Sequence, residues 1–205
     1  MINEIADGLA LAPGYLDQSQ QTAVLADIRK VVAAAPLYQP VMPRSGRPFS
    51  VKMSNCGPLG WISDKAGYRY QATHPDTGQP WPDMPGSITK IWDDLSGHGA
   101  PAECCLINFY RAGAKMGLHR DENEEDFSAP VVSVSLGDEA LFRFGGSERK
   151  SRTKSLRLAS GDVLIMAGAS RLNYHGVDKI YPGTSSLLRG GGRLNLTLRR
   201  VTRQV

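Results

Sequence analysis

The chain has 205 residues, of which 41% are hydrophobic and 21% charged, and its formal net charge is +4. These values are those of a soluble globular protein with one domain, or one domain with an extension. No apolar run reaches the ~18 residues that a membrane span needs, and the first residues lack the pattern of a signal peptide. We therefore expect a cytoplasmic protein without a membrane partner.

The three cysteines exclude two further classes of protein. Cys104 and Cys105 are adjacent within an apolar run, and Cys56 stands alone. An odd number of cysteines is no disulfide framework, and the lack of a C-x-x-C motif excludes a common zinc pattern. Buried thiols in a reducing cytoplasm fit this usage best.

The first predicted element is a helix from Gln18 to Ala35, where apolar residues recur at helical spacing. Asp17 or Ser19 can cap its start, and Pro36 follows its end. Residues 40–85 are rich in Gly, Pro and aromatic residues, with short strand-like pieces.

A second, short helix is predicted next. Ser87 precedes apolar residues at helical spacing, and the pattern ends near Gly97. From Glu103 onward nearly every segment has the pattern of a strand. The predicted strands are Glu103–Tyr110, Pro130–Leu136, Ala140–Phe144, Leu156–Leu158, Asp162–Met166 and Arg193–Val201. Short strands separated by Gly- and Asp-rich turns favour a sandwich or barrel, and a jelly roll is the form we expect.

Three residues form a candidate metal site. His119 and Asp121 follow the apolar run of the first long strand, and His175 comes 54 residues after Asp121. In an extended chain, positions i and i+2 point the same way, and two imidazoles with one carboxylate suit non-haem iron(II). The alternative is an ordinary surface histidine beside a capping aspartate. A second H-x-D, at His74 and Asp76, lies among Pro, Gly and Thr, which indicate a turn.

The segment from Arg193 to Arg199 alternates polar and apolar residues. If the polar set faces the interior of a jelly roll, its arginines can bind a small dicarboxylate in a bidentate manner. The alternative places the leucines in the core and the polar side chains in water. The polar set is Arg193, Asn195, Thr197 and Arg199, and the apolar set is Leu194, Leu196 and Leu198.

Charge is unevenly distributed along the chain. Residues 1–142 hold 11 Lys and Arg against 17 Asp and Glu, whereas residues 143–205 hold 13 against 3. The densest basic segment runs from Arg149 to Arg157. A one-sided basic surface is typical of a protein that binds nucleic acid, although a solvated loop would give the same composition.

The chain resembles the AlkB family of iron(II)- and 2-oxoglutarate-dependent nucleic-acid demethylases over roughly residues 50–200. The H-x-D…H…R-x-N-x-x-x-R set is shared across the wider superfamily, whereas the stretches that contain GPLGW, PWP and INFY are more specific to AlkB. The matching stretches are MSNCGPLGW, GYRY, PWPDMP, CLINFYRAGAKMGLHRDENE, APVVSVSLGDEALFRFGG, SGDVLIMAG, SRLNYHG and RLNLTLR.

The resemblance implies roles for the matched residues. By this analogy Arg193 meets the far carboxylate of 2-oxoglutarate, and Arg199 meets the carboxylate that chelates iron. No catalytic residue beyond the metal ligands is implied. The implied iron ligands are His119, Asp121 and His175. The implied 2-oxoglutarate pocket is Asn108, Tyr110, Arg193, Asn195 and Arg199. The implied substrate-binding residues are Trp61, Tyr68, Tyr70, Met53 and Asn123.

Two positions depart from the family pattern. Asn123 stands where the family has an acidic residue that can recognise an exocyclic amine, and Ser155 stands where it has a basic substrate residue. Lys154 and Arg152 are possible replacements for the second. These departures affect base preference rather than the oxidative chemistry.

The fold implied is mainly β with flanking helices: a double-stranded β-helix with an N-terminal helical and lid extension. We expect residues 1–100 to form the N-terminal helix and the nucleotide-recognition lid, packed on an oxygenase core of residues 101–205 as one structural unit. The function implied is oxidative repair of N-alkylated bases of the 1-methyladenine and 3-methylcytosine type. The cofactor would be iron(II), with 2-oxoglutarate and dioxygen consumed and formaldehyde, succinate and carbon dioxide released.

The expected partner is alkylated DNA, in single-stranded form, with RNA left open, and the expected state is a monomer. The alternative is a 2-oxoglutarate oxygenase that acts on a protein or small molecule, which would need neither the aromatic lid nor the basic half. A non-enzymatic jelly-roll binding module would need neither the complete metal set nor the paired arginines.

Overall fold

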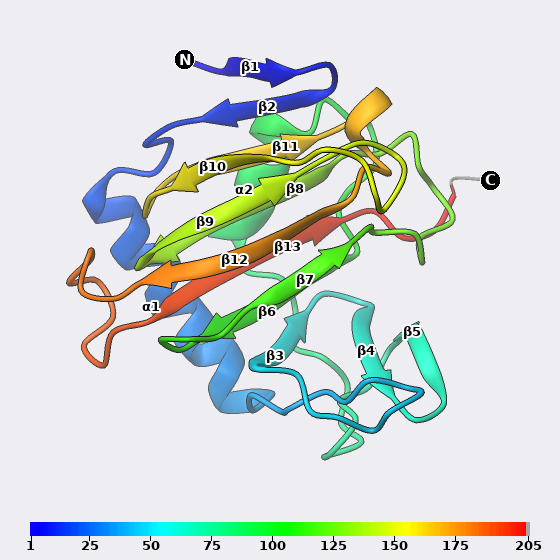
Figure 1. Ribbon diagram of the computed structural model, residues 1–205. Coiled ribbons are helices and arrows are strands. Elements are labelled where there is room, and N and C mark those ends of the chain that lie inside the picture. Colours follow the sequence, from blue (N-terminus) through cyan, green and yellow to red (C-terminus); the bar gives the residue numbers. More distant parts are fainter. Residues whose placement is uncertain (204–205) are drawn as a thin grey trace.

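The computed structural model describes residues 1–203, which form two facing β-sheets, two helices behind the larger sheet and a small hairpin at one side (Figure 1). The helices are α1 (Gln18–Ala34), α2 (Gly86–Leu95) and the short 3-10 helix η1 (Gly168–Ser170). The strands are β1 (Asn3–Ala6), β2 (Leu9–Ala12), β3 (Val51–Cys56), β4 (Gly60–Asp64), β5 (Gly67–Gln71), β6 (Cys104–Tyr110), β7 (Met116–His119), β8 (Val131–Gly137), β9 (Glu139–Phe144), β10 (Lys154–Leu158), β11 (Val163–Met166), β12 (His175–Tyr181) and β13 (Arg193–Arg199).

The larger sheet has the strand order β1-β2-β11-β8-β13-β6-β3, and the smaller sheet has the order β10-β9-β12-β7. Neighbouring strands pair antiparallel, and β4 and β5 form a separate two-stranded sheet. This is the jelly-roll arrangement that the short, regularly spaced strands predict. β2 and β3, which precede residue 100, pair with strands of the core, and β1 pairs with β2, so the first 100 residues also extend the larger sheet.

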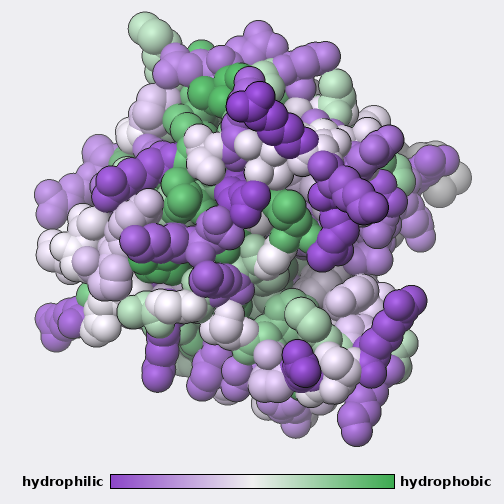
Figure 2. Space-filling view, in the orientation of Figure 1, coloured by the Kyte–Doolittle hydropathy of each residue, from purple (hydrophilic) through white to green (hydrophobic). Residues whose placement is uncertain are grey.

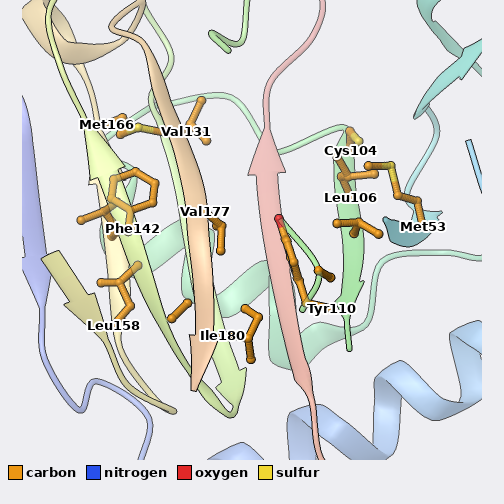
Figure 3. Close-up of a cluster of buried hydrophobic side chains, with 14 of the residues drawn as sticks. Met53, Cys104, Leu106, Tyr110, Val131, Phe142, Leu158, Met166, Val177 and Ile180 are labelled. Carbon is orange, nitrogen blue, oxygen red and sulfur yellow. The ribbon is translucent and has the colours of Figure 1, made fainter. Parts of the chain in front are cut away.

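Two apolar layers hold the fold together. One layer lies between the sheets and includes Leu106, Phe142 and Met166 (Figure 3). The other lies between the larger sheet and the two helices, and includes Ile28 and Leu196. Both faces of the larger sheet are therefore covered, which leaves the space between the sheets as the place where a site can open.

The N-terminus of α1 forms as the sequence predicts. Asp17 caps the helix: its Oδ1 accepts from the backbone of Gln20 at 2.8 Å, and Gln20 Oε1 accepts from the backbone of Asp17 at 2.9 Å. The start of α2 differs by a residue, since Ser87 lies inside the first turn and donates to Asp27 of α1 at 2.8 Å. That bond ties the two helices together behind the sheet.

The predicted strands are all present, with ends that shift by one or two residues. Three strands, β1, β2 and β12, were not predicted from the sequence. β1 and β2 are short strands at the edge of the larger sheet, and β12 has mixed polarity with an irregular register near Val177. Among residues 1–203 no helix is both long and apolar enough to cross a membrane.

Candidate active site

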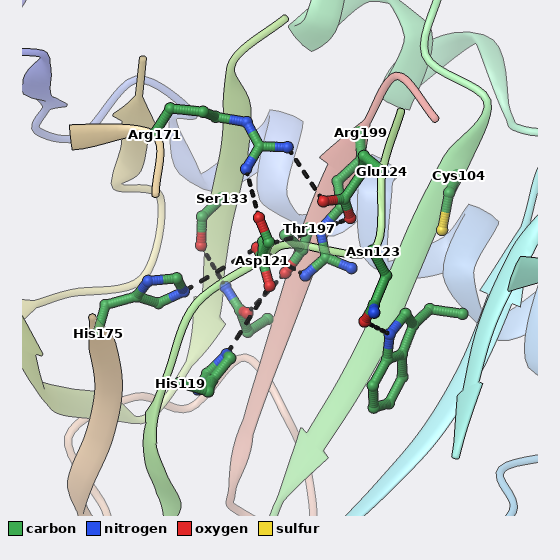
Figure 4. A network of polar contacts seen from close by, with 12 residues as sticks. Cys104, His119, Asp121, Asn123, Glu124, Ser133, Arg171, His175, Thr197 and Arg199 are labelled. Atoms are coloured by element: carbon green, nitrogen blue, oxygen red, sulfur yellow. Dashed lines mark hydrogen bonds and ion pairs between the residues drawn. The ribbon is translucent and has the colours of Figure 1, made fainter. Parts of the chain in front are cut away.

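Three predicted metal ligands meet between the sheets. His119 ends β7, His175 begins β12, and the two residues are partners in the antiparallel pairing of these strands. Asp121 lies two residues beyond β7. Its carboxylate oxygens are 3.9 Å from His119 Nε2 and 4.0 Å from His175 Nε2, so one ligand atom from each residue faces a common point (Figure 4).

Gly176 explains why β7 can lie so close to β12. A Cβ atom at this position would stand 2.6 Å from the backbone oxygen of Met116 and 3.0 Å from that of Gly117. Any larger residue would push β7 away from β12 and separate the two imidazoles. The glycine that follows His175 is therefore part of the geometry of the site.

Both imidazoles are held in the form that a metal requires. His119 Nδ1 donates to Gly117 O at 2.9 Å, and His175 Nδ1 donates to Asn173 O at 3.0 Å. The lone pair of each ring is then on Nε2, toward Asp121. Burial, followed by the neighbouring His119, lowers the pKa of His175 to about 4, so its imidazole is neutral at pH 7. Two imidazoles and a carboxylate fit iron(II) with open positions.

Arg199 keeps the carboxylate of Asp121 charged. Burial alone would raise the pKa of Asp121, but the guanidinium of Arg199, followed by the two imidazoles, outweighs burial and holds this pKa well below its usual range. Arg199 Nε and Nη2 donate to Asp121 Oδ2 at 3.1 and 2.9 Å. Arg199 thus orients the acidic ligand directly.

The predicted 2-oxoglutarate residues line one cavity of about 420 Å³ that also holds the three ligands. They come from β6 and β13, whose register places Asn195 opposite Asn108 and Arg193 opposite Tyr110. On β13 the polar residues face this cavity, while the leucines pack toward the helices. The interpretation that the alternating strand faces inward is confirmed, and its solvent-facing alternative is wrong. The lining residues among the predicted set are Asn108, Tyr110, Arg193, Asn195 and Arg199.

Arg193 is a buried cation that suits an anionic ligand. Its side chain is among the largest fully buried ones, at 1% exposure, and Nη2 donates to Ser135 Oγ at 2.7 Å. Within residues 1–203 no carboxylate forms an ion pair with it, and its Nε lacks a hydrogen-bond partner, as does Asn108 Oδ1. Unpaired polar atoms at such depth are costly, and a carboxylate in the cavity would satisfy Arg193.

The lid hairpin, which we define as β4 and β5, carries aromatic residues to the mouth of the cavity. The rings of Trp61 and Tyr68 stack with centroids 5.6 Å apart, and both line the cavity together with the buried Met53. Trp61 Nε1 donates to Asn123 Oδ1 at 3.1 Å. Figure 2 shows the surface hollowed between the smaller sheet and the lid hairpin, with hydrophilic side chains around it.

Tyr70 differs from the expectation that it holds the base. It does not line the cavity. Its hydroxyl donates to Glu124 and accepts from Arg199 Nη1 at 3.2 Å, because the ring reaches past the cavity to the buried charges behind Asp121. Tyr70 therefore contacts the buried residues that hold Asp121 in place, and not the cavity itself.

Two of the buried residues behind Asp121 were not predicted from the sequence. Arg171 and Glu124 form a buried ion pair at 3.2 Å, and Arg171 also donates to the backbone oxygen of Asp121 at 2.8 Å (Figure 4). Arg171 lies within the SRLNYHG stretch that carries the resemblance. The burial of Arg171 could not be predicted from its residue type, because charged side chains are mostly exposed in proteins.

The second H-x-D motif is a structural turn, as its composition indicates. His74 is 2% exposed, its Nε2 donates to Pro36 O at 2.7 Å, and its Nδ1 accepts from the backbone nitrogen of Asp76 at 3.1 Å. Asp76 is exposed. The motif therefore anchors a loop beside the lid.

The basic segment Arg149–Arg157 spans the end of the β9–β10 loop and most of β10. Arg149 lines the cavity at its mouth. Arg157 is turned elsewhere: it pairs with Glu139, and its guanidinium lies 4.2 Å from the ring centroid of Tyr181. Part of the segment is thus beside the cavity and part is engaged on the outer face of the smaller sheet.

The comparison with protein families agrees with this geometry. The family model described as the 2OG-Fe(II) oxygenase superfamily matches residues 8–199. The chain belongs to this superfamily. It is an iron(II)- and 2-oxoglutarate-dependent dioxygenase, which uses dioxygen as the second co-substrate.

Within the superfamily the chain is a member of the AlkB family. It is 50% identical over 196 residues to the alpha-ketoglutarate-dependent dioxygenase AlkB homolog of Caulobacter vibrioides, covering 96% of this chain and 89% of that protein. It is 42% identical to AlkB of Escherichia coli strain K12, covering 86% and 83% of the two chains. The solved structure of OsALKBH1 superposes with a TM-score of 0.82 at 31% identity, covering 98% of this chain and 100% of that chain. These likenesses confirm the predicted family and the jelly-roll fold.

Proposed function

We propose that this dioxygenase removes N-alkyl groups from damaged bases in nucleic acid, of the 1-methyladenine and 3-methylcytosine type. The observation that carries the proposal is that one cavity holds the three metal ligands and Arg193, with the aromatic rings of the lid hairpin above them. Similarity to AlkB dioxygenases supports the same conclusion.

The roles within the cavity follow from the positions of the side chains. Arg193 would bind the far carboxylate of 2-oxoglutarate, and Asn108 and Tyr110 line the same pocket. Iron(II) held by the two histidines and Asp121 would supply, with 2-oxoglutarate and dioxygen, the oxidation of the N-methyl carbon that ends in formaldehyde, succinate and carbon dioxide. We assign no separate acid or base, because the protein positions the reactants and excludes water.

Recognition of the base is assigned to the mouth of the cavity. A base must leave its stack to reach the metal, and a lesion that blocks pairing lowers the cost of extrusion. Trp61 and Tyr68 offer aromatic faces on which any base can stack. Because extrusion costs least from an unpaired strand, we propose single-stranded DNA as the main substrate, with RNA as a second one.

One further residue concerns the choice of base, and the cysteines concern the cellular compartment. Asn123 at the mouth can donate as well as accept, unlike the acidic residue of the family pattern. The free cysteines at positions 56, 104 and 105 are buried, which supports the prediction of a reducing, cytoplasmic setting. A monomer remains the predicted state.

The proposal is tested by mass spectrometry of methylated oligonucleotides incubated with the protein, iron(II), 2-oxoglutarate and air. We expect 1-methyladenine or 3-methylcytosine to lose the mass of one CH2, because hydrogen replaces the methyl group, with stoichiometric succinate. Oligonucleotides in both DNA and RNA form, single and paired, would rank the substrates. Succinate formation with every oligonucleotide left methylated would point instead to a protein or small-molecule substrate.

A further inference from the structure

The lid hairpin reaches the predicted metal site through two hydrogen bonds that end on adjacent residues. Trp61 Nε1 donates to Asn123 at 3.1 Å, and the hydroxyl of Tyr70 donates to Glu124. Asn123 and Glu124 follow Asp121 by two and three positions. Both contacts therefore act on the segment that carries the only carboxylate among the three predicted ligands.

That segment depends on side chains for its shape. Residues 120–130, which we call the ligand loop, form neither helix nor strand. Arg171 binds the loop at three points: it donates to the backbone oxygens of Asp121 and Ala129 at 2.8 and 2.9 Å, and it pairs with Glu124 at 3.2 Å. An ion pair at such depth is sensitive to geometry, because either charge left alone is strongly unfavourable.

Glu124 is the point where these contacts meet. One carboxylate oxygen faces Arg171, and the other accepts from Tyr70 and lies 3.7 Å from Arg199 Nε. Arg199 in turn holds Asp121 Oδ2. A shift of the lid hairpin would therefore reach Arg199, which orients the acidic metal ligand, through Tyr70 both directly at 3.2 Å and by way of Glu124.

We propose that Glu124 is a positioning residue that couples the lid hairpin to the metal centre. Filling the metal and co-substrate sites stiffens the lid, and a base held by the lid favours the productive position of Asp121, because coupling between two sites is reciprocal. The inference rests on the proposed function, since it takes iron(II) and 2-oxoglutarate to bind beside Asp121. The lid is suited to this, because it is a two-stranded sheet with a half-exposed β5, and contacts outside the hairpin therefore contribute much of its stability.

Hydrogen–deuterium exchange of residues 60–71 tests the coupling without any nucleic acid. Mn²⁺ replaces iron, and exchange is followed with and without Mn²⁺ and 2-oxoglutarate. In the parent we expect the two ligands to slow exchange in the lid roughly fivefold or more, the lower end for coupled sites. Calorimetry on the same samples shows whether the ligands bind.

Tyr70→Phe removes the hydroxyl that contacts Glu124 and Arg199 and leaves the ring and the Trp61–Asn123 bond, so ligands should slow exchange in the lid much less than in the parent. Tyr38→Phe is the matched control, because the Tyr38 hydroxyl donates to Trp61 O at 3.1 Å and so binds the lid without touching the ligand loop. It should keep the slowing seen in the parent. Glu124→Gln should weaken Mn²⁺ binding by about tenfold or more, because it removes the charge that faces Arg171 and Arg199, the two side chains that hold Asp121.

Slowing in Tyr70→Phe as large as in the parent would overturn the inference, and so would an equal reduction in both tyrosine variants. If Glu124→Gln does not fold, the comparison of the tyrosine variants still decides. A parent that binds Mn²⁺ and 2-oxoglutarate without any change in lid exchange would overturn this inference alone. A parent that binds neither ligand would overturn the proposed function as well.

Discussion

The strands beneath the cavity and the lid hairpin above it are built in opposite ways. β13 pairs along its whole length with β6 on one side and β8 on the other, and Arg193 on it is 1% exposed. The lid hairpin pairs only with itself, and Tyr68 on it is 48% exposed. A central strand paired on both sides opens only with the whole fold, whereas the lid hairpin, anchored by the buried Ile62 but half-exposed throughout β5, opens at lower cost. The structure thus fixes the chemistry and leaves recognition adjustable.

If the buried region carries the chemistry, removing a metal ligand should have the largest effect. Asp121→Ala and His175→Ala should each lower succinate formation by more than about 100-fold, since the loss of mere supporting partners already costs 10–100-fold. Succinate assay with added iron measures this effect. Near-normal rates in both variants would remove the metal assignment.

The control for this test is Asp76→Ala, which alters the exposed carboxylate of the other H-x-D motif. It should behave like the parent. The sequence alone predicts the same for His74→Ala, but the burial of His74 makes that variant a test of stability instead. An inactive, folded Asp76→Ala would show that the wrong motif had been chosen.

The next largest effect is expected on the binding of 2-oxoglutarate. Arg193→Lys and Arg199→Lys keep the charge but lose the planar fork, and should weaken 2-oxoglutarate binding by about 1.5–3 kcal/mol. Isothermal titration gives the dissociation constants. Arg200→Lys, whose arginine pairs with Glu103 outside the cavity, is the control. Unchanged constants in both cavity variants would contradict the assigned pocket.

Removing the aromatic face of Trp61 should weaken binding of the base far more than binding of the co-substrate. Trp61→Ala should lose about 1–3 kcal/mol of oligonucleotide binding, the contribution of one aromatic–base stack. Fluorescence anisotropy with a methylated oligonucleotide measures it, and Tyr181→Ala on the outer face of the smaller sheet is the control. An equal loss of 2-oxoglutarate affinity in Trp61→Ala would erase the proposed division between the two regions.

The smallest effect is expected from the basic segment, which contributes positive charge without recognising the base. Replacing Arg149, Lys150 and Arg152 by glutamine should weaken all oligonucleotides alike. Each lost phosphate contact should reduce the salt slope by about 0.7 for a single strand. Anisotropy at several salt concentrations tests this, with Lys30 and Lys90 on the helices as control positions. Selective weakening of one lesion would contradict a purely electrostatic role.

The sequence predicted the parts of the site that repeat along one strand or within one motif. The alternation from Arg193 to Arg199 and the spacing of His119 and Asp121 are local patterns, and the structure places them between the sheets. The Arg171–Glu124 pair joins residues 47 positions apart, and nothing near either residue marks it as buried. The orientation of Tyr70 likewise depends on buried charges contributed by distant segments.

The burial of both faces of β13 has a consequence for how this protein tolerates change. Six of its seven residues are buried, and the seventh, Asn195, lines the cavity. In a library that varies every position, β13 would form a block with almost no neutral substitutions, since each side chain serves either the cavity or the helix-facing core. The lid hairpin has half-exposed positions throughout β5 and would supply most of the variants from which new substrate preferences can be selected.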